Sequence, residues 1–109
     1  MGNLQAGRGT YAVIFRAEAE APDDDYAAMA AMLRDMALRD FGCLEFCAVT
    51  EGRHEIALSY WPDLASIKAW KAQAEHMVAQ RLGRERWYSA YRLQIAHIEK
   101  DYTFSRNAE

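Results

Sequence analysis

The hydrophobic pattern of the first third of the chain predicts one strand and one helix. Residues 10–17, TYAVIFRA, are rich in β-branched and aromatic side chains, and the run ends before Pro22 and three aspartates. Asp23 or Asp24 can cap a helix, because an acidic first turn suits the positive end of the helix dipole. Apolar side chains then recur at the spacing of one helical face, at Tyr26, Met29, Ala30, Leu33, Met36 and Ala37.

The rest of the chain predicts a hairpin, a second helix and a final strand. Gly42 ends the first helix and Gly83 the second, since glycine readily adopts the conformation that terminates a helix. The letters EGR mark a tight turn between two runs of strand-forming residues. In order, we expect a strand over 43–50, a strand over 54–61, a helix from Asp63 to about Leu82, and a strand over 87–104.

This order of elements, β-α-β-β-α-β, predicts an α+β fold of the ferredoxin-like kind, with two helices on one face of a four-stranded antiparallel sheet. The length favours a single domain, residues 1–109, with an ordered core over about 10–104. Tyr11, Val13 and Phe15 make one face of the first strand apolar, and Ala12 and Ile14 do the same for the other. Two helices cover only one face, so we expect a homodimer.

Charge and hydropathy exclude some partners. The chain carries 13 basic and 16 acidic residues, a net charge of -3, and no basic stripe follows any element. Nucleic acid is therefore not expected as a partner. No stretch approaches the roughly 20 apolar residues of a membrane span, and the first residues lack the apolar run of a secretory signal. We expect a cytoplasmic protein without membrane contact.

The two cysteines, Cys43 and Cys47, lie four residues apart in a run of strand formers. An extended chain separates such residues by about 13 Å, which is too far for a disulfide. We expect both to be small buried hydrophobic side chains on one strand face, with a metal pair or a nucleophilic cysteine as the open alternatives.

The segment AWKAQAEH, residues 69–76, places a tryptophan and a histidine in the second predicted helix. On a straight helix Ile67, Ala74 and Met77 share a face with Trp70, whereas His76 points about 120° away. Trp70 is then a core anchor against the sheet, and His76 is a surface or subunit-interface residue. A break in the helix would rotate His76 and allow the two residues to line one pocket.

The sequence from ALSYW to RERWY resembles the antibiotic biosynthesis monooxygenase domain. The pattern is a strand ending in Tyr-Trp, a helix with Trp-Lys and Glu-His, then Gln-x-x-Gly-Arg, and Trp-Tyr opening the last strand. It is matched by Tyr60, Trp61, Trp70, Lys71, Glu75, His76, Gln80, Gly83, Arg84, Trp87 and Tyr88. The resemblance is most specific over 56–104 and keeps the same order of elements over 10–50.

Members of that family with known chemistry oxidise aromatic phenols or anthrones with molecular oxygen, without flavin or metal, and relatives degrade haem. The resemblance implies a cofactor-independent monooxygenase that forms a dimeric α+β barrel, with a pocket between sheet and helices in each subunit. The family's working residues are an Asn on the first strand and a Trp and a His on the second helix. Trp70 matches the tryptophan, Phe15 or Arg16 stands in place of the Asn, and Gln80 stands at the haem-ligand position.

Such chemistry needs a base, donors that hold a developing oxyanion, and a dry aromatic pocket. Trp70 and His76 are the candidate catalytic residues, since an imidazole changes charge near neutral pH. Candidate substrate-binding residues are strand arginines and aromatics: Tyr11, Phe15, Arg16, Trp61, Trp87, Tyr91 and Arg92. The three histidines, His54, His76 and His97, have no ligand partners at metal-binding spacing, and no phosphate loop is present, so we expect no metal, flavin or haem cofactor.

The sequence thus leads to a cofactor-independent monooxygenase that oxidises a small aromatic or enolisable ligand with O₂. The alternative is a non-catalytic dimeric module that binds a small apolar ligand or associates with itself. The two hypotheses differ in what the space between sheet and helices contains. Convergence of His76 and an arginine on a cavity lined by Trp70 would favour catalysis, and a space filled by side chains would favour the alternative.

Overall fold

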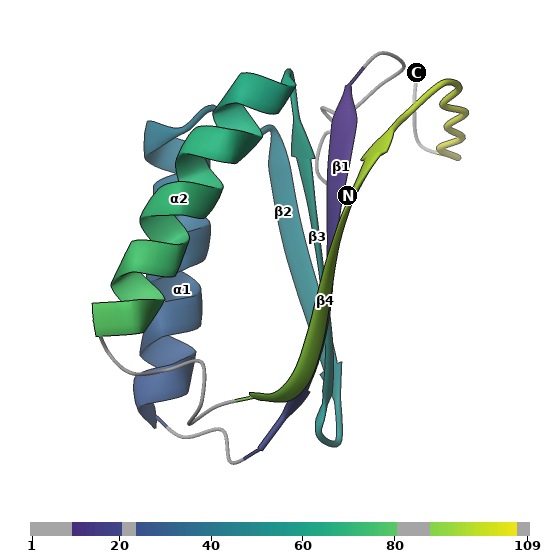
Figure 1. Ribbon diagram of the computed structural model, residues 1–109. Helices are drawn as coiled ribbons and strands as arrows, with labels where there is room; N and C mark the ends of the chain where they lie inside the picture. The colour runs from purple at the N-terminus through teal and green to yellow at the C-terminus, as the bar shows by residue number, and fades with distance from the viewer. Residues whose placement is uncertain (1–9, 21–23, 81–87, 107–109) are drawn as a thin grey trace.

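Four strands and two helices make up the computed structural model, which describes residues 10–20, 24–80 and 88–106 (Figure 1). In chain order they are β1 (Tyr11–Ala19), α1 (Asp24–Asp40), β2 (Glu45–Glu51), β3 (His54–Trp61), α2 (Leu64–Gln80) and β4 (Tyr88–His97). The strands pair antiparallel in the order β2-β3-β1-β4. The predicted βαββαβ order and the ferredoxin-like α+β fold are confirmed.

Two predicted helix boundaries have the local chemistry that the sequence indicated. Gly42 adopts a φ of 81°, and the Cys43 N–H donates to the Ala37 carbonyl at 3.0 Å, which closes the end of α1. The Ser66 N–H donates to Asp63 Oδ1 at 2.8 Å, so Asp63 caps α2. This hydrogen bond lowers the pKa of the Asp63 carboxyl. Other predicted boundaries, such as Gly83, lie outside the described residues.

Two expectations about strands were wrong. The last strand ends at His97 rather than at residue 104, and the following segment keeps one backbone bond to the sheet, from the Ile98 N–H to the Thr10 carbonyl at 2.9 Å. Cys47 is exposed rather than buried, because it lies on the face of β2 that points away from the helices, whereas Cys43 is buried. The two cysteines are free thiols.

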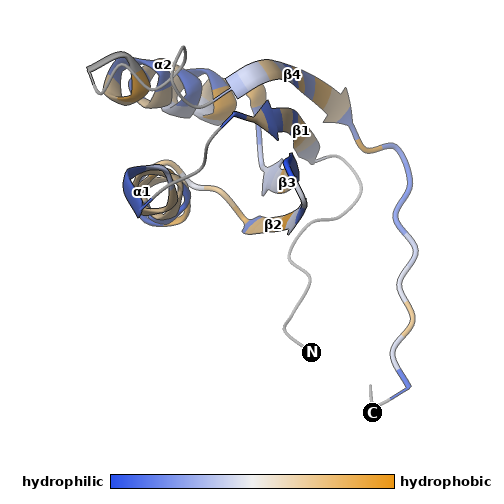
Figure 2. Ribbon diagram, turned by 90° about the horizontal axis from the view of Figure 1, so that it is seen from below, coloured by the Kyte–Doolittle hydropathy of each residue, from blue (hydrophilic) through white to orange (hydrophobic). Residues whose placement is uncertain are grey.

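Both helices cover one face of the sheet (Figures 1 and 2). In the register of the sheet, Phe15 of β1 lies opposite Ala57 of β3 and Leu93 of β4, and all three side chains point toward the helices. The neighbouring residues Ile14 and Arg16 therefore point to the opposite face.

The hydrophobic core occupies one end of the layer between sheet and helices, where β3 and α1 end and α2 begins. It consists of Val13, Met36, Ala37, Cys43, Trp61, Ile67, Trp70 and Ala74. Trp61 is fully buried, and its indole Nε1 donates to Ser59 Oγ at 2.8 Å. The ring centroids of Trp61 and Trp70 are 5.3 Å apart. Two large rings in contact thus anchor the helices to the sheet at this end.

The outer face of the sheet carries apolar side chains that no described element covers. Val49 is 67% exposed and Ile56 is 40% exposed. After β4 the chain runs away on the side opposite the helices (Figure 2), and it exposes Tyr102 and Phe104. No helix in the described parts of the chain is long and apolar enough to cross a membrane.

Candidate ligand-binding cavity

A cavity of about 630 Å³ lies between the sheet and the helices, next to the hydrophobic core, with which it shares Val13, Trp70 and Ala74. Its walls come from the first half of α1, the second half of α2 and the facing parts of the four strands. Small side chains create the space: alanines of α1 face alanines of the sheet across it, namely Ala27, Ala30, Ala31, Ala48 and Ala57. A cavity of this size can hold a small aromatic molecule.

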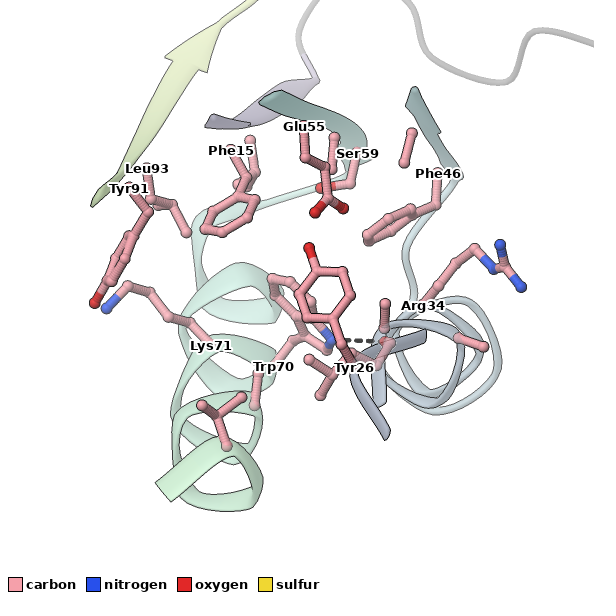
Figure 3. Close-up of a pocket in the computed structure, with 18 of the residues that line it drawn as sticks. Phe15, Tyr26, Arg34, Phe46, Glu55, Ser59, Trp70, Lys71, Tyr91 and Leu93 are labelled. Atoms are coloured by element: carbon pink, nitrogen blue, oxygen red, sulfur yellow. Dashed lines mark hydrogen bonds between the residues drawn. The ribbon is translucent and has the colours of Figure 1, made fainter. Parts of the chain in front are cut away.

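Aromatic rings form one wall of the cavity. Phe15, Tyr26, Tyr88 and Tyr91, which we call the aromatic cluster, come from β1, α1 and β4. The Tyr88 ring centroid lies 5.7 Å from Phe15, 5.8 Å from Tyr26 and 5.7 Å from Tyr91. Trp70 of α2 closes the cavity toward the core, and its Nε1 donates to the Leu33 carbonyl at 3.1 Å (Figure 3).

Glu55 brings a carboxylate into the cavity from β3. Side chains alternate along a strand, so Glu55 shares the helix-facing side of β3 with Ala57 and Ser59. Figure 3 shows its carboxylate directed into the cavity, toward the hydroxyl of Tyr26 on α1. Burial raises the pKa of the Glu55 carboxyl above its usual value. Burial and, secondarily, the charge of Glu55 raise the pKa of the Tyr88 hydroxyl, which therefore stays protonated as a donor.

Two basic side chains reach the rim of the cavity, and each lies close to an acidic side chain of its own helix. Lys71 Nζ donates to Glu75 Oε2 at 2.7 Å. Arg34 Nε lies 3.6 Å from Asp35 Oδ1, and its guanidinium points away from the cavity (Figure 3). Within the described residues Glu55 forms no ion pair. Among the charged residues that line the cavity, Glu55 is thus the one that has no ion-pair partner in the described chain.

The structure brings three of the predicted site residues together. Trp70, Phe15 and Tyr91 all line the cavity. Trp61 instead lies in the packed core, and Tyr11 packs beside it with its ring centroid 4.8 Å from that of His97.

The other predicted site residues lie elsewhere. His76 is exposed on α2 and is not among the residues that line the cavity. Arg16 and Arg92 are exposed on the outer face of the sheet, where they lie opposite each other in the register of β1 and β4. Trp87 lies outside the described residues. In the parts of the chain that the structure describes, no three His, Cys, Asp or Glu side chains gather as a metal site.

Sequence reasoning missed Tyr26, Glu55 and Tyr88 as cavity residues. Tyr26 belongs to the predicted apolar stripe of α1, a pattern that does not distinguish a core residue from a cavity wall. Tyr88 belonged to the Trp-Tyr pair that opens the last strand. The signal for Glu55 was its place in HEIALSYW, two residues before Ala57 and four before Ser59 on the buried face of the strand.

Comparison with known sequences gives one clear relationship. No family model matches the chain. The chain is 32% identical to the uncharacterized protein YqjZ of Bacillus subtilis (strain 168) over 99 residues, which cover 89% of this chain and 86% of YqjZ.

Solved structures share the fold at low sequence identity. A variant of SnoaB, a cofactor-independent oxygenase from Streptomyces nogalater, superposes with a TM-score of 0.64 at 13% identity, covering 92% of this chain and 96% of SnoaB. A candidate antibiotic biosynthesis monooxygenase from Chloroflexus aurantiacus gives 0.52 at 17% identity, over 79% of this chain and 91% of that chain. A protein of unknown function from Nitrosomonas europaea gives 0.69 at 14% identity, over 93% and 98% of the two chains. The chain therefore belongs to the family of YqjZ, and it has the antibiotic biosynthesis monooxygenase fold that its sequence predicted.

Proposed function

We propose that the protein binds a small aromatic or enolisable molecule in the cavity and oxidises it with O₂, without a bound flavin, haem or metal. The observation that carries the proposal is the Glu55 carboxylate inside a cavity walled by aromatic rings. The shared fold with SnoaB, a cofactor-independent oxygenase, agrees with this chemistry. The proposal makes Trp70 and the aromatic cluster the walls that exclude water from the substrate.

In this proposal Glu55 is the base. A half-buried carboxylate with a raised pKa is a stronger base than a fully solvated one, and Glu55 faces the cavity whereas the exposed His76 does not. Glu55 takes a proton from an activated CH₂ group of the substrate and leaves a carbanion, whose carbon keeps the second hydrogen that is later lost in water. The carbanion and O₂ combine to a peroxide anion, which takes the proton back from Glu55. Loss of water from the hydroperoxide then yields a ketone or quinone.

Oxygen consumption with a soluble anthrone tests the proposal. The Glu55→Gln variant should lose about 10²- to 10⁴-fold of the rate of the unmodified protein, the usual contribution of a general base. The matched control is Glu51→Gln, which removes the same charge from an exposed residue of β2 that does not line the cavity. Equal rates for all three proteins would refute the role of Glu55. The purified protein should show no flavin or haem absorbance while it turns over.

A second candidate function is binding without chemistry. It is favoured by the pairing of Lys71 with Glu75 and of Arg34 with Asp35, because an oxygenase gains from an unpaired positive charge near the developing anion. Calorimetric titration of the same anthrone decides between the two. Saturable binding without oxygen consumption would support the binding module.

We further propose that the protein is a homodimer joined through the outer face of the sheet. The exposed Val49 and Ile56 support this, since apolar side chains in a row on one open face are typical of an interface. Sedimentation at micromolar concentration should give twice the mass of the chain. A Val49→Lys variant should shift the equilibrium toward monomer, and a stable monomer of the unmodified protein would contradict the proposal.

A further inference from the structure

The wall of the cavity combines several aromatic rings with two glutamates, Glu75, which pairs with Lys71, and Glu55, which forms no ion pair in the described residues. The ring centroid of Tyr88 lies within 5.8 Å of those of the other three rings of the aromatic cluster, and Phe15 and Tyr91 are also 5.8 Å apart. The four rings therefore form a continuous surface. Glu55 projects from the adjacent strand into the space that these rings border (Figure 3). Aromatic rings beside a carboxylate are a recurring way to recognise organic cations, because ring faces and carboxylate both attract positive charge.

We propose that the natural ligand is an organic cation, an aromatic molecule with an alkylammonium group, whose charged nitrogen lies between Glu55 and the rings of the aromatic cluster. This inference rests on the proposed function in one respect, that the cavity is the ligand site. The ammonium N–H groups donate to the Glu55 carboxylate, and the aromatic part of the ligand packs toward Trp70 and the alanines of α1.

The electrostatics of the cavity favour a cation over a neutral ligand. Glu55 is half-buried, and taking a carboxylate partly out of water costs free energy unless a positive charge pairs with it. Lys71 Nζ donates to Glu75 Oε2 at 2.7 Å, and the guanidinium of Arg34 points away from the cavity. Neither side chain therefore pairs with the Glu55 carboxylate in the described structure. A cationic ligand supplies that positive charge. The unpaired charge of Glu55 would thus make the cavity bind a cationic ligand more tightly than a neutral one of the same shape.

A cationic substrate also provides what the oxygenase chemistry lacks. Arg16 and Arg92, the residues expected to hold a developing anion, lie on the opposite face of the sheet from the cavity. A positive nitrogen on the substrate itself would stabilise the anion that remains after proton loss. The absence of Arg16 and Arg92 from the cavity lining is then consistent with catalysis.

The experiment compares two ligands of nearly equal shape, tyramine and tyrosol. Both are phenols with a two-carbon arm, but the arm ends in an ammonium group in tyramine and in a hydroxyl group in tyrosol. Calorimetric titration at low salt should show that the unmodified protein binds tyramine about tenfold or more tightly than tyrosol, the scale of a charge-assisted hydrogen bond with a cation–π contact.

Two variants assign this preference to the cavity. Glu55→Gln keeps the shape of the side chain and removes its charge, so the preference for tyramine should disappear while tyrosol still binds. Glu51→Gln removes a charge outside the cavity and should keep the preference. A circular dichroism spectrum of each variant checks that it folds.

The outcomes separate this inference from the proposed function. Equal affinity of the unmodified protein for the two ligands would overturn the inference and leave the aromatic-ligand site standing. A preference for tyramine that survives in Glu55→Gln would also overturn it. Binding of neither ligand would count against both the inference and the proposed ligand site.

Discussion

The two ends of the layer between sheet and helices are built from the same elements but are filled differently. At the packed end, the rings of Trp61 and Trp70 together with Ile67 occupy the space between the layers. At the hollow end, alanines of α1 face alanines of the sheet, and a cavity of about 630 Å³ remains. The packed end fixes the distance between the helices and the sheet. At that distance the alanines of the hollow end do not fill the space between them.

The difference indicates where stability and where function reside. The packed end buries large apolar side chains and satisfies both indole N–H groups with hydrogen bonds. The hollow end instead exposes a carboxylate and the aromatic cluster to an unfilled space, which gives little stability and suits a ligand. Substitutions at the two ends should therefore have unequal effects on the free energy of unfolding.

The largest difference is expected for removal of a ring. Trp61→Ala at the packed end should lower the free energy of unfolding by about 3–5 kcal/mol, because a fully buried ring leaves a cavity behind. Tyr91→Ala at the hollow end should cost about 1 kcal/mol or less, since Tyr91 is 47% exposed. Urea unfolding of both variants measures the two losses. Equal losses would mean that the hollow end is packed as tightly as the other.

Addition of volume should give the opposite ranking of tolerance. Ala37 and Ala30 lie two turns apart on the same face of α1, Ala37 in the core and Ala30 at the cavity. Ala37→Leu should cost about 1–3 kcal/mol through overpacking, whereas Ala30→Leu should change stability by less than about 0.5 kcal/mol. Ala30→Leu should also weaken the binding of tyrosol, which calorimetry measures. Unchanged binding would place the ligand outside the cavity.

The charge at the hollow end should make stability depend on pH. Burial raises the pKa of Glu55 in the folded state, so folding favours its protonated form. The stabilising contribution is fully present below the unfolded pKa and is lost as the pH rises through the folded pKa. Glu55→Gln should therefore be more stable than the unmodified protein at pH 8, and the gap should shrink toward pH 4. A constant gap in urea midpoints would contradict this linkage.

The smallest effect is expected at His76, which lies outside both ends. Because its side chain is exposed on α2, His76→Ala should change stability by less than about 0.5 kcal/mol. It should also leave ligand affinity and oxygen consumption unchanged. A rate that falls by tenfold or more in a folded His76→Ala variant would show that His76, rather than Glu55, is the base.

The fold was predictable from the sequence because its signals are local. The alternation of apolar residues in TYAVIFRA, the helical stripe that begins at Tyr26, and the stop at Gly42 each act within a few residues. The resemblance to a known domain then pointed to Trp70, which does line the cavity. Local pattern and family resemblance therefore gave the architecture and one wall of the site.

The cavity itself was not predictable in the same way. An alanine on the apolar face of a helix, such as Ala30, is expected in the core. Whether its side chain packs against a neighbour or borders a cavity depends on the distance between the helix and the sheet. The approach of Glu55 and Tyr26 depends on the same distance, since the two residues lie on elements that share no pattern in the sequence. A tertiary spacing thus separates a core residue from a binding residue.

The central claim, that the hollow end is a ligand site, is tested most directly by a crystal structure of the protein soaked with 4-ethylphenol. The account predicts one molecule per chain, with its ring against the aromatic cluster and its hydroxyl within hydrogen-bond distance of Glu55. A space closed by Tyr26 and Trp70, with no ligand density between sheet and helices, would contradict it.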